Sequence, residues 1–228
     1  MKWHIALGLT LPMFFLAAHA QESADSGLST DKQKYSYAIG MQIGNSLSKQ
    51  GVDLDPDAFA MAIRDVVSGA QPKLSGEEAD QIVKGQQVAL IKARAEKNAQ
   101  AGADFRKQYL AGENTKTLGN GILYRVLKEG TGAKPGVNDS VSVNYVGKFV
   151  NGKVFDSSEN NGGPVSFPLK GIIKGWQETL QLMPEGSKWE IVVPPEMAYG
   201  MQGSGPIGPD ETLVFVIDLV KIESGKAN

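Results

Sequence analysis

The sequence predicts an α+β protein: an all-helical amino-terminal domain, one long connecting helix, and a carboxy-terminal domain built on a curled antiparallel sheet packed on one short helix. Two observations support this fold class. Apolar residues recur at helical spacing in the first two predicted helices, and after Gly112 they alternate with period two between frequent turn signals. The 228 residues, 41% of them apolar, can support a buried core.

The first twenty residues have the features of a secretory signal peptide. Met1-Lys2 is a short basic start, residues 5–18 are apolar but too few to span a membrane comfortably, and Ala18-His19-Ala20 is a cleavage pattern. We expect residues 1–20 to be removed as the protein is secreted across the inner membrane into the periplasm, and association with the outer membrane stays open. An uncleaved membrane anchor is the alternative, although no stop-transfer pattern follows.

Cleavage leaves a mature chain without histidine or cysteine. Both histidines, His4 and His19, lie in the signal segment, and the sequence has no cysteine. Thiol nucleophiles, disulfides, histidine bases and Cys or His metal ligands are therefore excluded, and we expect no metal and no cofactor. Loss of Lys2 changes the formal charge from -2 to -3, which gives no basic surface for nucleic acid.

The first predicted helix begins after Thr30 and ends at Gly51. Gln33 lies three residues after Thr30, in the spacing of a capping box. Small residues recur along this helix at every fourth position, so another helix can cross it closely: Ser36, Gly40, Gly44 and Ser48. Packing within one chain and packing between two chains are both open interpretations of this row.

The second predicted helix begins at Pro56, and the third is unusually long. Asp55 places a capping carboxylate before the proline. Ser75 starts a capping box, and no proline follows before Gly112, so a helix of about 35 residues, roughly 50 Å long, is allowed. Its middle, residues 92–104, has almost no apolar stripe, which predicts a solvated stalk.

The second domain reads as strands joined by short turns. Alternating apolar residues predict strands over 122–128, 141–145, 189–193 and 212–222, and the segment 173–182 is the one expected helix. Asn151-Gly152 predicts a type I′ hairpin. The domain boundaries expected from these patterns are 1–20 for the signal peptide, 21–74 for the helical domain, 75–112 for the connecting helix and 113–228 for the sheet domain.

Aromatic residues of the second domain lie at strand ends or beside glycine and proline loops. They are Tyr145, Phe155, Phe167, Trp176, Tyr199 and Phe215. A pocket walled by rings is one interpretation, and ordinary core packing is the other. Tyr199 favours the pocket, because the loop over residues 200–206 that follows it is rich in glycine and predicts an exposed flap.

Five segments of this domain occur in the order and spacing of one known family. They are Val143-Asn144-Tyr145-Val146-Gly147, Gly152-Lys153-Val154-Phe155-Asp156-Ser157-Ser158, Ile173-Lys174-Gly175-Trp176, Ala198-Tyr199-Gly200 and Thr212-Leu213-Val214-Phe215. Residues 119–223 therefore resemble the FKBP-type peptidyl-prolyl cis-trans isomerases. The segments 28–32, 67–70 and 206–209 resemble the macrophage infectivity potentiator (Mip) subgroup, so the resemblance covers nearly the whole mature chain.

The resemblance implies an enzyme that accelerates rotation about Xaa-Pro bonds, acting on proline-containing polypeptides and unfolded client proteins. It implies catalytic roles for Tyr145, Phe155, Asp156, Trp176, Tyr199 and Phe215, and substrate binding by Val165, Phe167, Ile172, Ile173 and Ile207. Trp176 would be the floor of the pocket, and Asp156 would be electrostatic and structural rather than a base. The backbone N–H of Ile173 and the hydroxyl of Tyr199 would bind substrate carbonyls.

The resemblance also implies a homodimer and macrolide inhibitors such as rapamycin. The expected dimer contacts are Gly40, Met41, Gly44 and Met61. Two departures from the family pattern bear on the site: residues 159–163 lack the basic residue that many relatives place near Asp156, and the flap lacks the histidine of some relatives. A chaperone that binds clients with residual or no isomerase activity is the alternative function.

Overall fold

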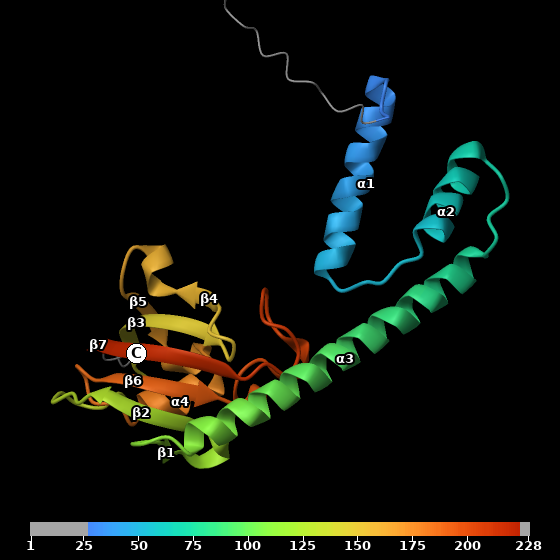
Figure 1. Ribbon diagram of the computed structural model, residues 1–228. Coiled ribbons are helices and arrows are strands. Elements are labelled where there is room, and N and C mark those ends of the chain that lie inside the picture. The colour runs from blue at the N-terminus through green and yellow to red at the C-terminus, as the bar shows by residue number, and fades with distance from the viewer. Residues whose placement is uncertain (1–26, 224–228) are drawn as a thin grey trace, which may run out of the picture. The chain divides into compact units, whose positions relative to one another are not determined.

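The computed structural model describes residues 27–223, so the predicted signal peptide over residues 1–20 lies outside the described residues. The chain divides into two compact units, one ending at Phe59 and one beginning at Ala60. Figure 1 shows helices in the first part of the chain and strands in the last part, as the sequence predicts. Within residues 27–223, no helix is both long enough and apolar enough to cross a membrane.

Helices α1 (Asp31–Lys49) and α2 (Pro56–Ser68) begin at the capping residues that the sequence predicts. The Thr30 hydroxyl accepts a hydrogen bond from the Gln33 N–H at 3.2 Å, and the Gln33 side chain accepts one from the Thr30 N–H at 2.9 Å. The Asp55 carboxylate accepts bonds from two N–H groups of the first turn of α2, each 2.9 Å long. These bonds satisfy donors that a helix start otherwise leaves without partners.

Helix α3 (Gly76–Leu110) has 35 residues, the length that the sequence allows. At its start the Ser75 hydroxyl accepts from the Glu78 N–H at 3.2 Å, and the Glu78 carboxylate accepts from the Ser75 N–H at 2.8 Å. The bonds from Ser75 lower the pKa of Glu78, because they stabilise its ionised form. The predicted capping box is confirmed.

The middle of α3 is largely exposed, as expected of a solvated stalk, but one narrow face of it is in contact. Ala95 is 4% exposed and Gly102 is also buried. A Cβ atom on Gly102 would lie only 2.9 Å from the Cβ of Thr212. The sequence did not predict this contact face, because small residues rather than an apolar stripe make it. They let the segment before the last strand approach the helix backbone.

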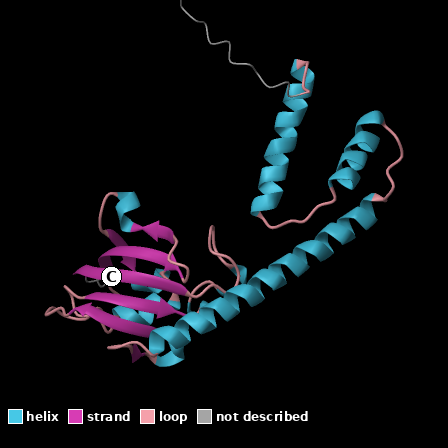
Figure 2. Cartoon of the chain, in the orientation of Figure 1, coloured by secondary structure: helices cyan, strands magenta, loops and turns pink. Residues whose placement is uncertain are grey.

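Within residues 27–223, seven strands form one antiparallel sheet in the order β1-β2-β6-β7-β3-β4, and β5 also pairs with β3. Figure 2 shows the strands in magenta. The strands are β1 (Lys116–Thr117), β2 (Leu123–Lys128), β3 (Ser140–Phe149), β4 (Val154–Ser157), β5 (Val165–Pro168), β6 (Lys188–Val193) and β7 (Leu213–Glu223). Short 3-10 turns connect them: η1 (Gly119–Gly121), η2 (Ser158–Asn161), η3 (Leu169–Gly171), η4 (Pro195–Met197) and η5 (Gly200–Gln202). Strand β3 pairs with three other strands: β7 lies along one of its edges, and both β4 and β5 pair with the other edge.

Helix α4 (Lys174–Leu180) packs on one face of the sheet, and the end of α3 packs on the other. The first core contains Trp176 and Leu180 of α4 together with the inward side chains of β3, β6 and β7. The second contains Tyr109 and, partly buried, Phe105 of α3 against β2, β6 and β7. Alternate residues of one strand therefore serve different cores, and the predicted sheet on one short α-helix is confirmed.

The β3–β4 hairpin does not have the type I′ turn that Asn151-Gly152 predicts. Such a turn requires positive φ at both residues, but only Gly152 has it, at 85°. The Gly152 N–H donates to the Phe149 carbonyl at 2.9 Å, and the Phe149 N–H donates to the Lys153 carbonyl at 2.9 Å. The Asn151 side chain accepts from the Lys153 N–H at 3.0 Å and so stabilises a type I turn followed by a glycine bulge.

Candidate functional site

Trp176, in the first turn of α4, is the centre of an aromatic cluster. Its side chain is 5% exposed. The rings of Tyr145 and Phe215 each lie 5.3 Å from it, at 82° and 84°, and the ring of Phe167 lies 6.0 Å away at 87°. Edge-to-face contacts of this kind are favourable. Three strands, β3, β5 and β7, therefore fix the plane of one indole on the helix.

Phe155 on β4 extends the cluster, and Gly147 on β3 makes room for it. The Phe155 ring lies 5.7 Å from that of Phe215 at 89°. A Cβ atom on Gly147 would lie 2.7 Å from Phe155 Cζ and 3.0 Å from Phe215 Cε1. The sequence analysis assigned no role to Gly147, although a glycine inside an alternating strand is itself a signal of close approach.

Asp156 has a tyrosine as its partner. The Tyr145 hydroxyl donates to Asp156 Oδ2 at 2.6 Å, and the Ser157 N–H donates to Oδ1 at 2.8 Å. Burial and this hydrogen bond raise the pKa of Tyr145, and burial together with the Asp156 charge raises the pKa of Tyr199. Both phenols therefore stay protonated at neutral pH beside one oriented carboxylate.

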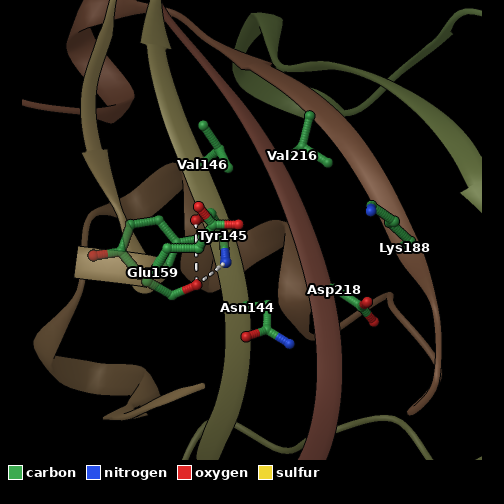
Figure 3. Close-up of a pocket in the computed structure, with 8 residues that line it drawn as sticks. Asn144, Tyr145, Val146, Glu159, Lys188, Val216 and Asp218 are labelled. Carbon is green, nitrogen blue, oxygen red and sulfur yellow. Dashed lines mark hydrogen bonds between the residues drawn. The ribbon is translucent and has the colours of Figure 1, made fainter. Parts of the chain in front are cut away.

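Ser158 is a second residue to which the sequence analysis gave no role. It is 2% exposed, and its hydroxyl accepts a hydrogen bond from the Tyr145 N–H at 3.1 Å. Figure 3 shows this bond and the nearby hollow of about 150 Å³. Most of the hollow's lining, including Asn144 and Val216, alternates with the inward Tyr145 and Phe215, so it lies on the other face of the sheet. Tyr145 lines the hollow as well, so it is the residue that the hollow shares with the aromatic cluster.

The structure brings the remaining site residues of the second domain to the same core. Val165, Phe167, Ile172 and Ile173 are partly buried and pack against the cluster that contains Trp176. Ile207 is 7% exposed within that core, so the expected flap is anchored at this point. Tyr199 at the start of the flap is 37% exposed and Met201 is 54% exposed, which leaves the other part of the flap open to solvent.

The expected dimer residues lie on exposed helix surfaces. Neither α1 nor α2 has a buried residue. Met41 is 53% exposed and Met61 is 40% exposed. In the first unit, Gly40 and Gly44 line a groove of about 550 Å³ together with Ile43, Leu47 and Phe59.

The aromatic cluster lies at the junction of the sheet and a short helix, and its polar groups are phenol hydroxyls and one oriented carboxylate. Such a cluster is suited to binding an uncharged apolar group. Comparison with known proteins places the chain in a family. FKBP-type peptidyl-prolyl cis-trans isomerase matches residues 131–220, and the domain amino terminal to FKBP-type peptidyl-prolyl isomerase matches residues 32–126. The chain belongs to the FKBP-type peptidyl-prolyl cis-trans isomerases.

The similarity to individual relatives extends over nearly the whole chain. The chain is 40% identical to the outer membrane protein MIP of Legionella longbeachae, in an alignment that covers 98% of this chain and 99% of that protein. It is 39% identical to the peptidyl-prolyl cis-trans isomerase Mip of Coxiella burnetii, covering 88% and 90%. The crystal structure of FkpA from Escherichia coli matches with a TM-score of 0.69 at 34% identity and covers 87% of this chain and 99% of that one. The resemblance to the family and its Mip-like subgroup is confirmed.

Proposed function

We propose that the chain accelerates cis/trans rotation of Xaa-Pro bonds by holding the proline ring against Trp176. The observation that carries this proposal is the set of rings that surrounds one buried indole, from Tyr145, Phe167 and Phe215. Such a site can receive a pyrrolidine ring but offers no nucleophile. Membership of the isomerase family supports the same reaction.

The reaction needs only differential stabilisation of a twisted amide. Amide resonance opposes rotation by about 18 to 20 kcal/mol, and half-rotation removes that resonance. The twisted state is less zwitterionic than the planar one, so an apolar site that excludes water disfavours the planar state relative to it. Each tenfold in rate requires about 1.4 kcal/mol of this difference.

Polar groups at the edge of the site hold the chain that carries the proline. The Tyr145 hydroxyl is already committed to Asp156. Tyr199, which is partly exposed, is therefore the phenol placed to donate to a substrate carbonyl, with the Ile173 N–H at the start of α4 as the second donor. Asp156 acts as a fixed negative wall, and no proton transfer is part of the reaction.

An NMR exchange measurement on a panel of short Xaa-Pro peptides tests the proposal. The wild type is expected to raise the cis/trans exchange rate, Trp176→Leu and Phe155→Ala to lower that effect at least tenfold, and Lys153→Ala in the nearby turn to leave it unchanged. An unchanged exchange rate with the wild type would contradict the isomerase proposal. Rapamycin, added to the wild type, is expected to compete with the peptide for the pocket.

We also propose that the amino-terminal helices form a homodimer. The exposed apolar side chains on α1 and α2 support it, among them Tyr35 at 70% and Val67 at 81%. Gly44→Leu, which adds a large side chain to the small-residue row, is expected to give a monomer in light scattering at micromolar concentration. Lys32→Ala on α1 is the matched control, and a monomeric wild type would refute the dimer.

Secretion into the periplasm is part of the proposal. The features of residues 1–20 support it, as does the name of the Legionella longbeachae relative, an outer membrane protein. The exported protein is expected to begin at Gln21 when its amino terminus is sequenced. Fractionation of the cell envelope distinguishes free periplasmic protein from protein attached to the outer membrane.

Binding of unfolded clients is a second candidate function, favoured by Met201, which is 54% exposed two residues after Tyr199. An apolar side chain at the open part of the flap can contact apolar segments beyond the proline. Met201→Ser is expected to weaken prevention of client aggregation while isomerisation of a short peptide is retained. Equal loss of aggregation prevention and of peptide isomerisation would show that clients bind through the isomerase site alone.

A further inference from the structure

Residues 200–212 form a closed loop before β7. The Asp210 N–H donates to the Gly200 carbonyl at 3.0 Å, which ties the two ends together. Nearer the tip, Ser204 and Ile207 exchange two backbone hydrogen bonds, each 2.9 Å long. We call residues 200–212 the site loop. Its internal bonds fix its shape but do not attach it to the rest of the domain.

The site loop touches the proposed substrate site at its beginning and at its middle. Tyr199 directly precedes it, and the Tyr199 carbonyl accepts a bond from the Gly203 N–H at 3.2 Å. Ile207 packs into the core cluster that contains Trp176. A displacement of the loop would therefore move a substrate donor and an apolar wall together.

Helix α3 lies against the outer part of this loop. Asn98 Nδ2 donates to the Pro209 carbonyl at 2.7 Å. One turn earlier, Arg94 covers Gly208 so closely that a Cβ there would lie 2.7 Å from Arg94 Nε. The Arg94 charge also opposes the rise in pKa that burial causes at Glu211 of the same loop. Two adjacent turns of the helix thus contact Gly208 and Pro209 of the loop, and Arg94 also acts electrostatically on Glu211.

The end of the loop is held by the next turns of α3. Arg106 Nη1 donates to Thr212 Oγ1, and Thr212 is 1% exposed. Gly102 lies directly below the same threonine. Ala95, Asn98, Gly102 and Arg106 are three or four residues apart, so they lie on one face of the helix. This side of α3 therefore contacts the site loop at positions between Gly208 and Thr212.

We infer that helix α3 supports the substrate site, and that Asn98 is a positioning residue for the isomerase reaction because it fixes the site loop through the Pro209 carbonyl. The inference rests on the proposed function. Asn98 is far from Trp176 in the sequence and acts on substrate only through the loop. Since Tyr199 and Ile207 contact substrate both before and during rotation, a loosened loop raises KM and leaves kcat nearly unchanged.

Two substitutions of Asn98 in the full-length mature chain test this inference. Asn98→Ala removes the donor, and Asn98→Asp places a carboxylate oxygen against the Pro209 carbonyl with little change in shape. We expect KM for an Xaa-Pro peptide to rise about threefold for the first and about tenfold for the second, the effect of losing one buried hydrogen bond and of opposing two acceptors. Gln100→Ala is the matched control, because its amide bonds only to Asp104 of the same helix.

Amide hydrogen exchange provides a readout that does not depend on activity. The Ser204 and Ile207 amides are expected to exchange faster in both Asn98 variants, while those of β6 and β7 keep the wild-type rate. Unchanged exchange in the loop would overturn the support by α3. Faster loop exchange with wild-type KM would overturn the positioning role. An inactive wild type would instead refute the proposed function, and the loop exchange would still decide whether α3 holds the loop.

Discussion

Gly147→Ala is the most direct test of how the aromatic cluster is built. The new Cβ would lie 2.7 Å from Phe155 Cζ, whereas carbon atoms in contact prefer about 3.5 to 4.0 Å. The Phe155 ring must therefore move by about 1 Å. It cannot move freely, because Phe149 lies 5.0 Å away and Phe215 lies 5.7 Å away between ring centres.

The expected cost follows from two opposing effects. Overpacking of this kind destabilises by about 1 to 3 kcal/mol. Replacing glycine by alanine within a strand offsets about 0.5 to 1 kcal/mol of that cost, because glycine loses more backbone entropy on folding. The two ranges leave a net loss of about 0 to 2.5 kcal/mol, centred near about 1 kcal/mol. Each kcal/mol lowers the melting temperature by roughly 4 to 8 °C in a domain of about 100 residues.

The activity of Gly147→Ala should fall more than its stability. A ring displaced by about 1 Å narrows the site, and misplacement on that scale can cost up to a hundredfold in rate. We expect kcat/KM to fall at least tenfold at a temperature where the variant is fully folded. Gly119→Ala is the control, because its Cβ would meet no atom within 4 Å. In Gly147→Ala/Phe155→Leu the smaller side chain should restore stability but not activity. A Gly147→Ala protein with wild-type melting temperature and rate would refute the reasoning.

Three further predictions follow from other contacts. Asp156→Asn should weaken the bond from Tyr145 and lower kcat/KM about tenfold, measured by peptide exchange, with less than about 1 kcal/mol change in urea unfolding. Burial raises the pKa of Tyr109 and Tyr145. Their contribution to the free energy of unfolding is therefore fully present below about pH 10 and declines as the pH rises above it. Tyr109→Phe should reduce that decline in unfolding titrations between about pH 9 and about pH 11. Gly85→Ala, at an open position of α3, should stabilise the helix by about 0.5 to 1 kcal/mol in thermal unfolding.

The helix starts could be predicted because their stabilising bonds are local. Thr30 and Gln33, and likewise Ser75 and Glu78, are three residues apart, so the sequence itself places donor beside acceptor. Strand patterns were predictable for a related reason. The face of a strand that packs on α4 must be apolar. Since successive side chains point to opposite faces of the sheet, apolar residues then alternate with others along the sequence.

The contacts that organise the site were less accessible because they depend on pairing between distant segments. Tyr145 and Asp156 were both expected in the site, but the partner expected for the carboxylate was a basic residue. The hairpin between β3 and β4 brings the phenol to 2.6 Å instead, so the partner comes from the neighbouring strand rather than from the residues that follow Asp156. Cross-strand neighbours of this kind depend on register, which shifts between Gly147 and Lys148 in this hairpin. The turn at Asn151-Gly152, wrongly predicted as type I′, gave no sign of that shift.

The α3 contact face escaped prediction for a different reason, and that reason bears on function. Its residues are small or polar because they meet a backbone, and backbone groups are satisfied by hydrogen bonds rather than by apolar side chains. Tyr109 lies at the end of the same helix and is contacted by Arg125 of β2. The Arg125 guanidinium donates to the Tyr109 carbonyl at 3.1 Å and lies 3.9 Å from the centre of the Tyr109 ring. These bonds fix the last turn of α3 to β2, while Asn98 and Arg106 fix earlier turns to the site loop. The structural unit that carries the isomerase site therefore includes α3 from about Arg94 onward.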